Sequence, residues 1–157
     1  MNCEYCKEQR NIIYDDGLIL GFLDSNPYTK GHIVLIPKQH YTIMEQVPDE
    51  VIGNLFVVAN KISAILFDVL KVNGTNVLIN NGIDQEIPHM SLNIIPRDEK
   101  DNLNLSWEPK KADEDDLDVV LHNLKNALIE KKSVEIDKKP VKIQSSSWID
   151  KTFNRIP

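Results

Sequence analysis

Apolar residues recur every three or four positions along two long stretches of the chain. One stretch runs from Asp49 to about Leu70, and the other from Asp113 to about Lys131. This period is typical of amphipathic helices that bury one side. The first stripe comprises Val51, Leu55, Val58, Ile62, Ile65 and Val69. The second comprises Leu117, Val120, Leu121, Leu124 and Leu128. The sequence therefore predicts two main helices.

Shorter apolar segments predict strands. Residues 12–14 and 18–23 flank an Asp-Gly step that favours a hairpin. Residues 32–37, 75–80 and 89–95 are the other segments of this kind. We therefore expect an α+β fold, in which helices pack on a mainly antiparallel sheet of about five strands.

The last of these predicted strands has a polar side. Because side chains alternate along a strand, His89, Ser91 and Asn93 share one face and the apolar residues between them share the other. Three hydrogen-bonding groups in a row on one face of an otherwise apolar strand indicate the floor of a binding or catalytic site.

Length and composition narrow the class of protein. A chain of 157 residues favours one domain, which we place at residues 1–132, with a tail over 133–157 that docks on the domain or on a partner subunit. The net charge of −6 argues against nucleic-acid binding. We find neither an apolar run long enough for a membrane span nor the apolar core of a secretory signal. The predicted location is the cytoplasm.

Two cysteines near the N-terminus could bind a metal. Cys3 and Cys6 have the spacing of half a tetrahedral zinc site. The other two ligands would have to come from the four histidines, His32, His40, His89 and His122. A redox dithiol and a pair of unrelated thiols remain alternatives at this point.

A series of ordered motifs extends over nearly the whole chain. It comprises Gly21-Phe22-Leu23-Asp24, Asn26-Pro27, the run from Lys30 to His40, Asn80-Asn81-Gly82 with Gln85 and His89, and Ile94-Ile95-Pro96-Arg97. This order resembles the histidine triad (HIT) superfamily, in its zinc-containing prokaryotic branch. The resemblance implies a HIT-like fold, a homodimer and a cleft that binds a purine nucleotide.

In that family, the middle histidine of a His-x-His-x-His strand attacks the α-phosphorus of the nucleotide. The matching positions here are His89, Ser91 and Asn93, so the triad is degenerate. Serine is a weak nucleophile without an adjacent base, and a phosphoserine would be more inert than a phosphoimidazole. The resemblance therefore implies a nucleotide hydrolase or transferase that is inactive or impaired.

The resemblance also implies roles for other residues. His32 matches a histidine that supports the nucleophile. Phe22 and Asp24 match residues that line the base and ribose pocket, and Asn80 and Gln85 match polar contacts on the phosphate side. The zinc ligands of the family correspond to Cys3, Cys6, His40 and His89, which makes zinc the expected cofactor.

The loop before the polar strand also departs from the family. Residues 82–85 are shorter than the usual stretch, lack its glycine before Gln85, and add the negative charge of Asp84. We expect weaker phosphate binding from these changes.

Three hypotheses follow. The favoured one is an impaired HIT protein that retains zinc and a nucleotide pocket. The second is an active hydrolase or transferase with a rearranged site, in which His32 is the base. The third is a structural, zinc-stapled dimer without a ligand.

Overall fold

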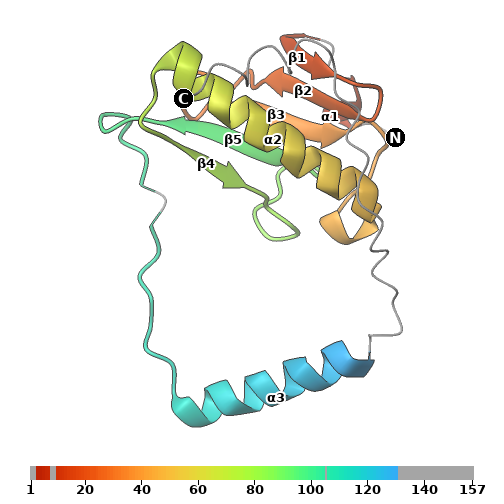
Figure 1. The fold of residues 1–157 in the computed structure, drawn as a ribbon, viewed down its shortest axis with the longest axis vertical. Helices are drawn as coiled ribbons and strands as arrows, with labels where there is room; N and C mark the ends of the chain where they lie inside the picture. The colour runs from red at the N-terminus through yellow and green to blue at the C-terminus, as the bar shows by residue number, and fades with distance from the viewer. Residues whose placement is uncertain (1–2, 8–9, 105, 131–157) are drawn as a thin grey trace, which may run out of the picture. The chain divides into compact units, whose positions relative to one another are not determined.

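The computed structural model describes residues 3–7, 10–104 and 106–130. Its strands are β1 (Ile12–Asp15), β2 (Ile19–Leu23), β3 (Ile33–Pro37), β4 (Gly74–Leu78) and β5 (Leu92–Arg97). Its helices are α1 (Glu4–Lys7), a 3-10 turn η1 (Met44–Gln46), α2 (Asp49–Leu70) and α3 (Glu114–Glu130). The strands form one antiparallel sheet in the order β1-β2-β3-β5-β4, which confirms the predicted fold class (Figure 1).

The described chain divides into two units. The first extends to Leu103 and holds the sheet with α1 and α2, and the second begins at Asn104 and holds α3. The apolar stripe predicted for α3 is present, and its leucines are exposed. The expected domain boundary at residue 132 and the docking of the tail fall outside the described residues, and both stay predictions.

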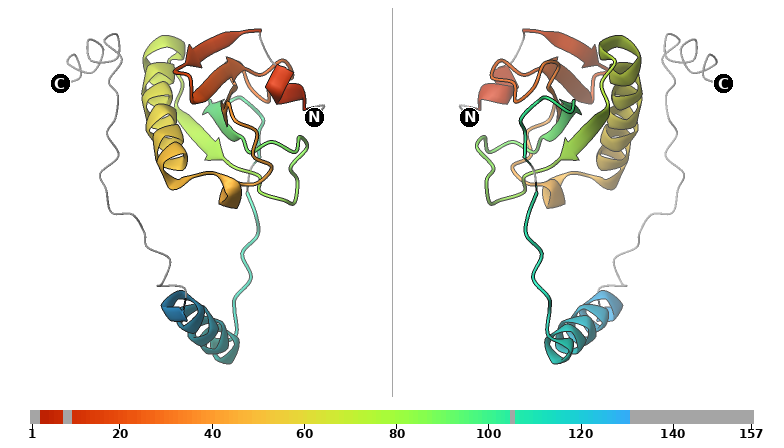
Figure 2. Two further views of the ribbon diagram at one scale, coloured as in Figure 1. Left: turned by 90° about the vertical axis from the view of Figure 1, so that its right-hand side faces the viewer. Right: turned by 90° about the vertical axis from the view of Figure 1, so that its left-hand side faces the viewer.

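The two faces of the sheet carry different side chains. On one face Ile33 and Leu35 of β3 join Leu92 and Ile94 of β5 in a core that the buried side of α2 covers. The α2 residues in this core are Leu55, Val58, Ala59, Ile62 and Leu66. Figure 2 shows α2 on this side of the sheet and α1 on the other.

The opposite face has a smaller apolar cluster. Leu20, Phe22, Val34 and Ile36 form it, and Tyr5 of α1 packs against it. Beyond this cluster the same face carries polar groups. The alternation read from the sequence along residues 32–37 is thus confirmed, because odd and even positions of β3 fall into separate clusters.

The polar strand is shorter at its start than predicted. β5 begins at Leu92, whereas the sequence pattern places its start at His89. The backbone N–H of Met90 donates to Tyr41 instead of to a neighbouring strand, and that of His89 donates to Ile87. These bonds hold His89 outside the ladder. Side chains still alternate there, since Met90 joins the core beside α2.

One helix of the described chain is long and apolar enough to cross a membrane by length and composition alone. It is α2, which has 22 residues and a mean hydropathy of 1.5. Its stripe is packed on the sheet, as the core helix of a globular domain would be.

A left-handed turn at Gly31 leads into β3. Gly31 has φ of +89°, and a Cβ there would lie 2.5 Å from Cδ1 of Leu70 in α2. Gly17 has the same φ, and a Cβ at that position would meet nothing within 4 Å. Both positions favour glycine for backbone reasons, and Gly31 is also sterically confined.

We expect Gly31→Ala to reduce the free energy of unfolding more than Gly17→Ala does. Gly17→Ala introduces left-handed strain of about 1–2 kcal/mol, and Gly31→Ala adds a clash with Leu70. Urea unfolding of both variants measures the difference. Equal losses would show that Leu70 moves aside without cost.

Candidate functional site

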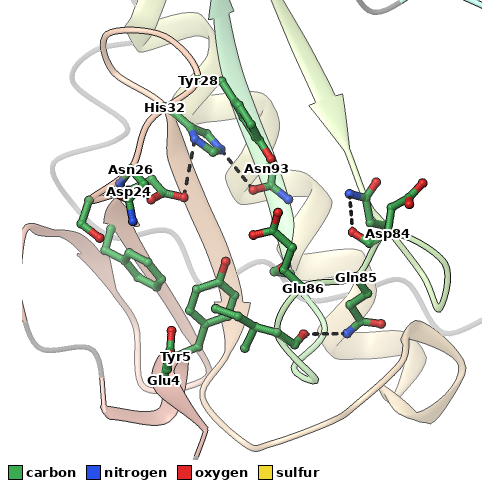
Figure 3. Close-up of a pocket in the computed structure, with 15 residues that line it drawn as sticks. Glu4, Tyr5, Asp24, Asn26, Tyr28, His32, Asp84, Gln85, Glu86 and Asn93 are labelled. Atoms are coloured by element: carbon green, nitrogen blue, oxygen red, sulfur yellow. Dashed lines mark hydrogen bonds and ion pairs between the residues drawn. The ribbon is translucent and has the colours of Figure 1, made fainter.

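A cleft lies on the sheet face opposite α2. It encloses about 530 Å³, a volume suited to a small organic ligand. β2 and β5 contribute to its floor, together with the residues just before β3 and β5. α1 and the turn before β3 form one wall, and the loop before β5 forms the other (Figure 3). Among its lining residues are Phe22, Asp24, His32, Asn80, Gln85, Ser91 and Asn93. The structure thus brings together the residues expected at the nucleotide and catalytic positions.

His32 is fixed at the base of this cleft. Its ring is 1% exposed, and its Nε2–H donates to Oδ1 of Asn93 over 3.1 Å. Val34 of β3 pairs with Asn93 of β5, so these two side chains lie on one face of the sheet. His32 lies two residues before Val34 and therefore shares that face with Asn93. Nδ1 lies 3.6 Å from Oδ2 of Asp24, and the Tyr28 ring stacks on the imidazole at 5.1 Å.

Burial lowers the pKa of His32, although the Asn93 hydrogen bond and the Asp24 carboxylate oppose the shift. The imidazole is therefore neutral at neutral pH. Its proton is on Nε2, where Asn93 accepts it.

Ser91 faces a tyrosine from the N-terminal helix. Burial and the nearby Asp24 carboxylate raise the pKa of Tyr5 to about 12, and a hydrogen bond with Ser91 opposes this rise. A phenol with so high a pKa is protonated at neutral pH and cannot take a proton from the Ser91 hydroxyl. The side chain that Ser91 contacts therefore does not activate it as a nucleophile.

The loop before β5 is held by its own side chains. Asn80 donates its amide to the carbonyl of Asp84 over 3.1 Å. Gln85 donates to the carbonyls of Thr42 and Ile87 over 2.7 and 3.1 Å. Asp84 has φ of 61°, so an aspartate supports the left-handed turn without the expected glycine.

A second cluster lies beside the cleft. Cys3, Cys6, His40 and His89 place their ligand atoms within 4.8 Å of one another. Sγ of Cys3 lies 3.4 Å from Nδ1 of His89, and Sγ of Cys6 lies 3.4 Å from Nδ1 of His40. Tetrahedral zinc with its usual bond lengths separates sulfur and nitrogen ligands by about 3.6 Å. Both the donor set and its spacing fit zinc.

Local structure explains why these four ligands meet. Cys3 and Cys6 lie one helical turn apart at α1, so their sulfurs face the same side. His40 follows the end of β3. His89 is fully buried and donates Nε2–H to the carbonyl of Pro37 over 2.9 Å, which turns the Nδ1 lone pair toward the sulfurs.

Burial in this cluster disfavours charge on its side chains. Burial lowers the pKa of His89, and burial together with the Cys3 thiol raises the pKa of Cys6. A bound cation would reverse the effect on the thiols, because zinc binds thiolates.

Sequence reasoning missed several residues that line the cleft. Tyr5 enters it from between the two cysteines, and Tyr28 enters it from the turn before β3. Glu4 and Glu86 bring further carboxylates. The position of Tyr5 between two expected zinc ligands was a signal that could have placed it beside His89. The fourth histidine, His122, is exposed on α3 and bonds to Asn126.

Comparisons with known proteins identify related sequences. A family model described as the HIT domain matches residues 7–100. The uncharacterized HIT-like protein of Methanocaldococcus jannaschii is 35% identical over 131 residues, which cover 78% of this chain and 98% of that protein. The adenosine 5′-monophosphoramidase of Saccharomyces cerevisiae is 33% identical over 123 residues, covering 73% of this chain and 75% of that protein.

A solved crystal structure has a fold similar to that of this chain. The crystal structure of a Zn-bound histidine triad family protein from Mycobacterium smegmatis matches with a TM-score of 0.62 and 29% identity. The match covers 81% of this chain and 98% of that chain.

We expect the purified protein to carry about one zinc ion per chain, as a single tetrahedral site requires. His40→Ala should weaken zinc binding by at least about tenfold, whereas the matched variant His122→Ala should retain the metal. Metal analysis and competition with a colorimetric chelator measure both. Retention of zinc by His40→Ala would contradict the assignment of this ligand.

The buried neutral His32 should make stability depend on pH. Because burial lowers its folded-state pKa below the unfolded value of about 6.5, its contribution is complete above that pH and is lost as pH falls. The free energy of unfolding should therefore fall more steeply from about pH 7 to about pH 5 in the native protein than in His32→Gln. Protonation of the cysteine–histidine cluster affects both proteins alike. Parallel curves would contradict a lowered pKa at His32.

Proposed function

This chain belongs to the HIT domain family, and we propose that it is a zinc-containing member that binds a purine nucleotide through its nucleoside part, with α-phosphate chemistry lost or severely weakened. The observation that carries the proposal is the floor of the cleft. There His32 and Asn93 form a hydrogen bond, while the residue that the resemblance matches to the family's nucleophile is Ser91.

The cleft supports binding of a nucleoside. Phe22 and the ring of Tyr5 provide an apolar wall, with their centroids 5.5 Å apart in an edge-to-face arrangement. Asp24 lies beside them, where its carboxylate can accept hydrogen bonds from ribose hydroxyls. An apolar aromatic wall next to a hydrogen-bond acceptor suits a base joined to a sugar.

The same cleft argues against turnover. A serine nucleophile needs a base within hydrogen-bonding reach. Tyr5, which contacts Ser91, has its pKa raised to about 12. The other candidate base, His32, hydrogen-bonds Asn93 through Nε2, and its Nδ1 lies 3.6 Å from the Asp24 carboxylate, so both ring nitrogens face groups other than Ser91. His89 is oriented by Pro37 toward the cysteines, where it would serve as a metal ligand.

Zinc has a structural role in this proposal. Cys3, Cys6, His40 and His89 would hold it, and all four coordination positions would be filled by protein groups. A closed tetrahedral site of this kind stabilises a fold and leaves no position for a substrate. The zinc-bound relative from Mycobacterium smegmatis supports the identity of the metal.

The family also supports two further parts of the proposal. We propose a homodimer, since HIT proteins resembling this chain are expected to pair, and a cytoplasmic location. The name of the yeast relative, an adenosine 5′-monophosphoramidase, supports an adenine nucleotide as the ligand to test first.

Incubation with adenosine 5′-monophosphoramidate should give no AMP above background. Ser91→Ala should leave this rate unchanged, because the serine is not activated. Ser91→His should raise it, since the imidazole is a better nucleophile and leaving group. Chromatographic detection of AMP measures all three proteins. Robust turnover in the native protein that Ser91→Ala abolishes would contradict the proposal and favour a rearranged active site.

A further inference from the structure

The cleft is strongly acidic. Four carboxylates line it, from Glu4, Asp24, Asp84 and Glu86, and its described lining residues include no lysine or arginine. They come from separate segments, so they surround the ligand space from α1, from the turn after β2 and from the loop before β5 (Figure 3). Asp24 and Glu86 both raise the pKa of Tyr5, which places two of these charges near the same phenol.

The donors of Gln85 and Gly82, in the loop expected to contact a phosphate, are already engaged. Both N–H groups of the Gln85 side-chain amide donate to backbone carbonyls, those of Thr42 and Ile87. The backbone N–H of Gly82 donates to Oε1 of Gln85, and that of Gln85 donates to the carbonyl of Gly82. An anion at this loop would have to break bonds that hold the loop together.

The floor of the cleft does not supply positive charge either. His32 is neutral at neutral pH because its burial lowers the pKa. Its Nε2 proton is directed to Asn93, so the imidazole presents no donor to the cleft from that atom. In place of two further histidines, the strand presents the hydroxyl of Ser91 and the amide of Asn93, which are uncharged at every accessible pH.

A phosphate monoester carries nearly two negative charges at neutral pH. Bringing it among four carboxylates without a cation incurs repulsion that a neutral nucleoside avoids. A ligand with a protonated amine at the same place would be attracted by these carboxylates.

We propose that this cleft selects a purine nucleoside that is uncharged, or that carries an amine at its 5′ end, over the same nucleoside bearing a 5′-phosphate. The inference rests on the nucleoside pocket of the proposed function, and it makes an uncharged or amine-bearing nucleoside, instead of the nucleotide, the preferred ligand. The carboxylates of Asp84 and Glu86 are the groups that exclude the phosphate, because they lie on the loop that would otherwise surround it.

Calorimetry on the zinc-loaded full chain tests this selection with three probes: adenosine, AMP and 5′-amino-5′-deoxyadenosine. We expect adenosine to bind about tenfold more tightly than AMP at low ionic strength. The amine should bind at least as tightly as adenosine. The difference between adenosine and AMP should shrink as salt is added, because Glu4, Asp84 and Glu86 are exposed.

Charge-neutral variants identify the responsible groups. Asp84→Asn combined with Glu86→Gln should tighten AMP binding to within about threefold of adenosine binding, with adenosine affinity nearly unchanged. Asparagine also tolerates the left-handed backbone at position 84. The matched control, Glu50→Gln with Glu99→Gln, removes the same charge from exposed positions outside the cleft and should leave the preference unchanged.

The outcomes separate the two proposals. AMP binding as tight as adenosine binding, or a preference unaltered by the cleft variants, would overturn the selection while leaving nucleotide binding intact. If none of the three probes produced heat, both the selection and the proposed function would be contradicted. Adenosine binding with the expected loss of preference in the cleft variants would support both.

Discussion

The alternation of side chains along β3 and β5 is the constraint on which the rest of the molecule depends. Ile33 pairs with Ile94 and Val34 pairs with Asn93, so one register assigns every residue of both strands to a face. A slip of one residue would move His32 and Asn93 under α2 and expose the apolar core. The apolar face provides the stability that fixes this register. The polar face can therefore accept substitutions at its site without loss of the fold.

The sequence predicted most of this arrangement because periodicity is a local property. The apolar stripe placed α2 at Asp49–Leu70, and the alternation from residue 32 to residue 37 placed His32 on the face opposite the core. The start of β5 was wrong, since the bonds of Met90 to Tyr41 and of His89 to Pro37 come from segments distant in the sequence. Periodicity contains no information about such contacts.

The site was predicted less completely than the fold. The resemblance to a known family identified the four metal-cluster residues, which meet as expected. It did not identify Tyr5, Tyr28 or Glu86, because their positions in the cleft depend on how α1 and two loops close over the sheet. The engagement of Gln85 with backbone carbonyls was equally hidden. A motif specifies which residue is present, and tertiary structure decides which of its atoms remain available.

The N-terminal helix links the two sites. α1 has four residues, too few to be stable alone, so its position depends on contacts made by its side chains. Cys6 and the adjoining Cys3 belong to the metal cluster, while Tyr5 between them forms part of the cleft wall. Thermodynamic linkage is reciprocal. If metal binding fixes Tyr5 and so strengthens ligand binding in the cleft, then ligand binding strengthens metal binding by the same factor. A metal bound at the cluster would therefore be coupled through α1 to a ligand bound in the cleft.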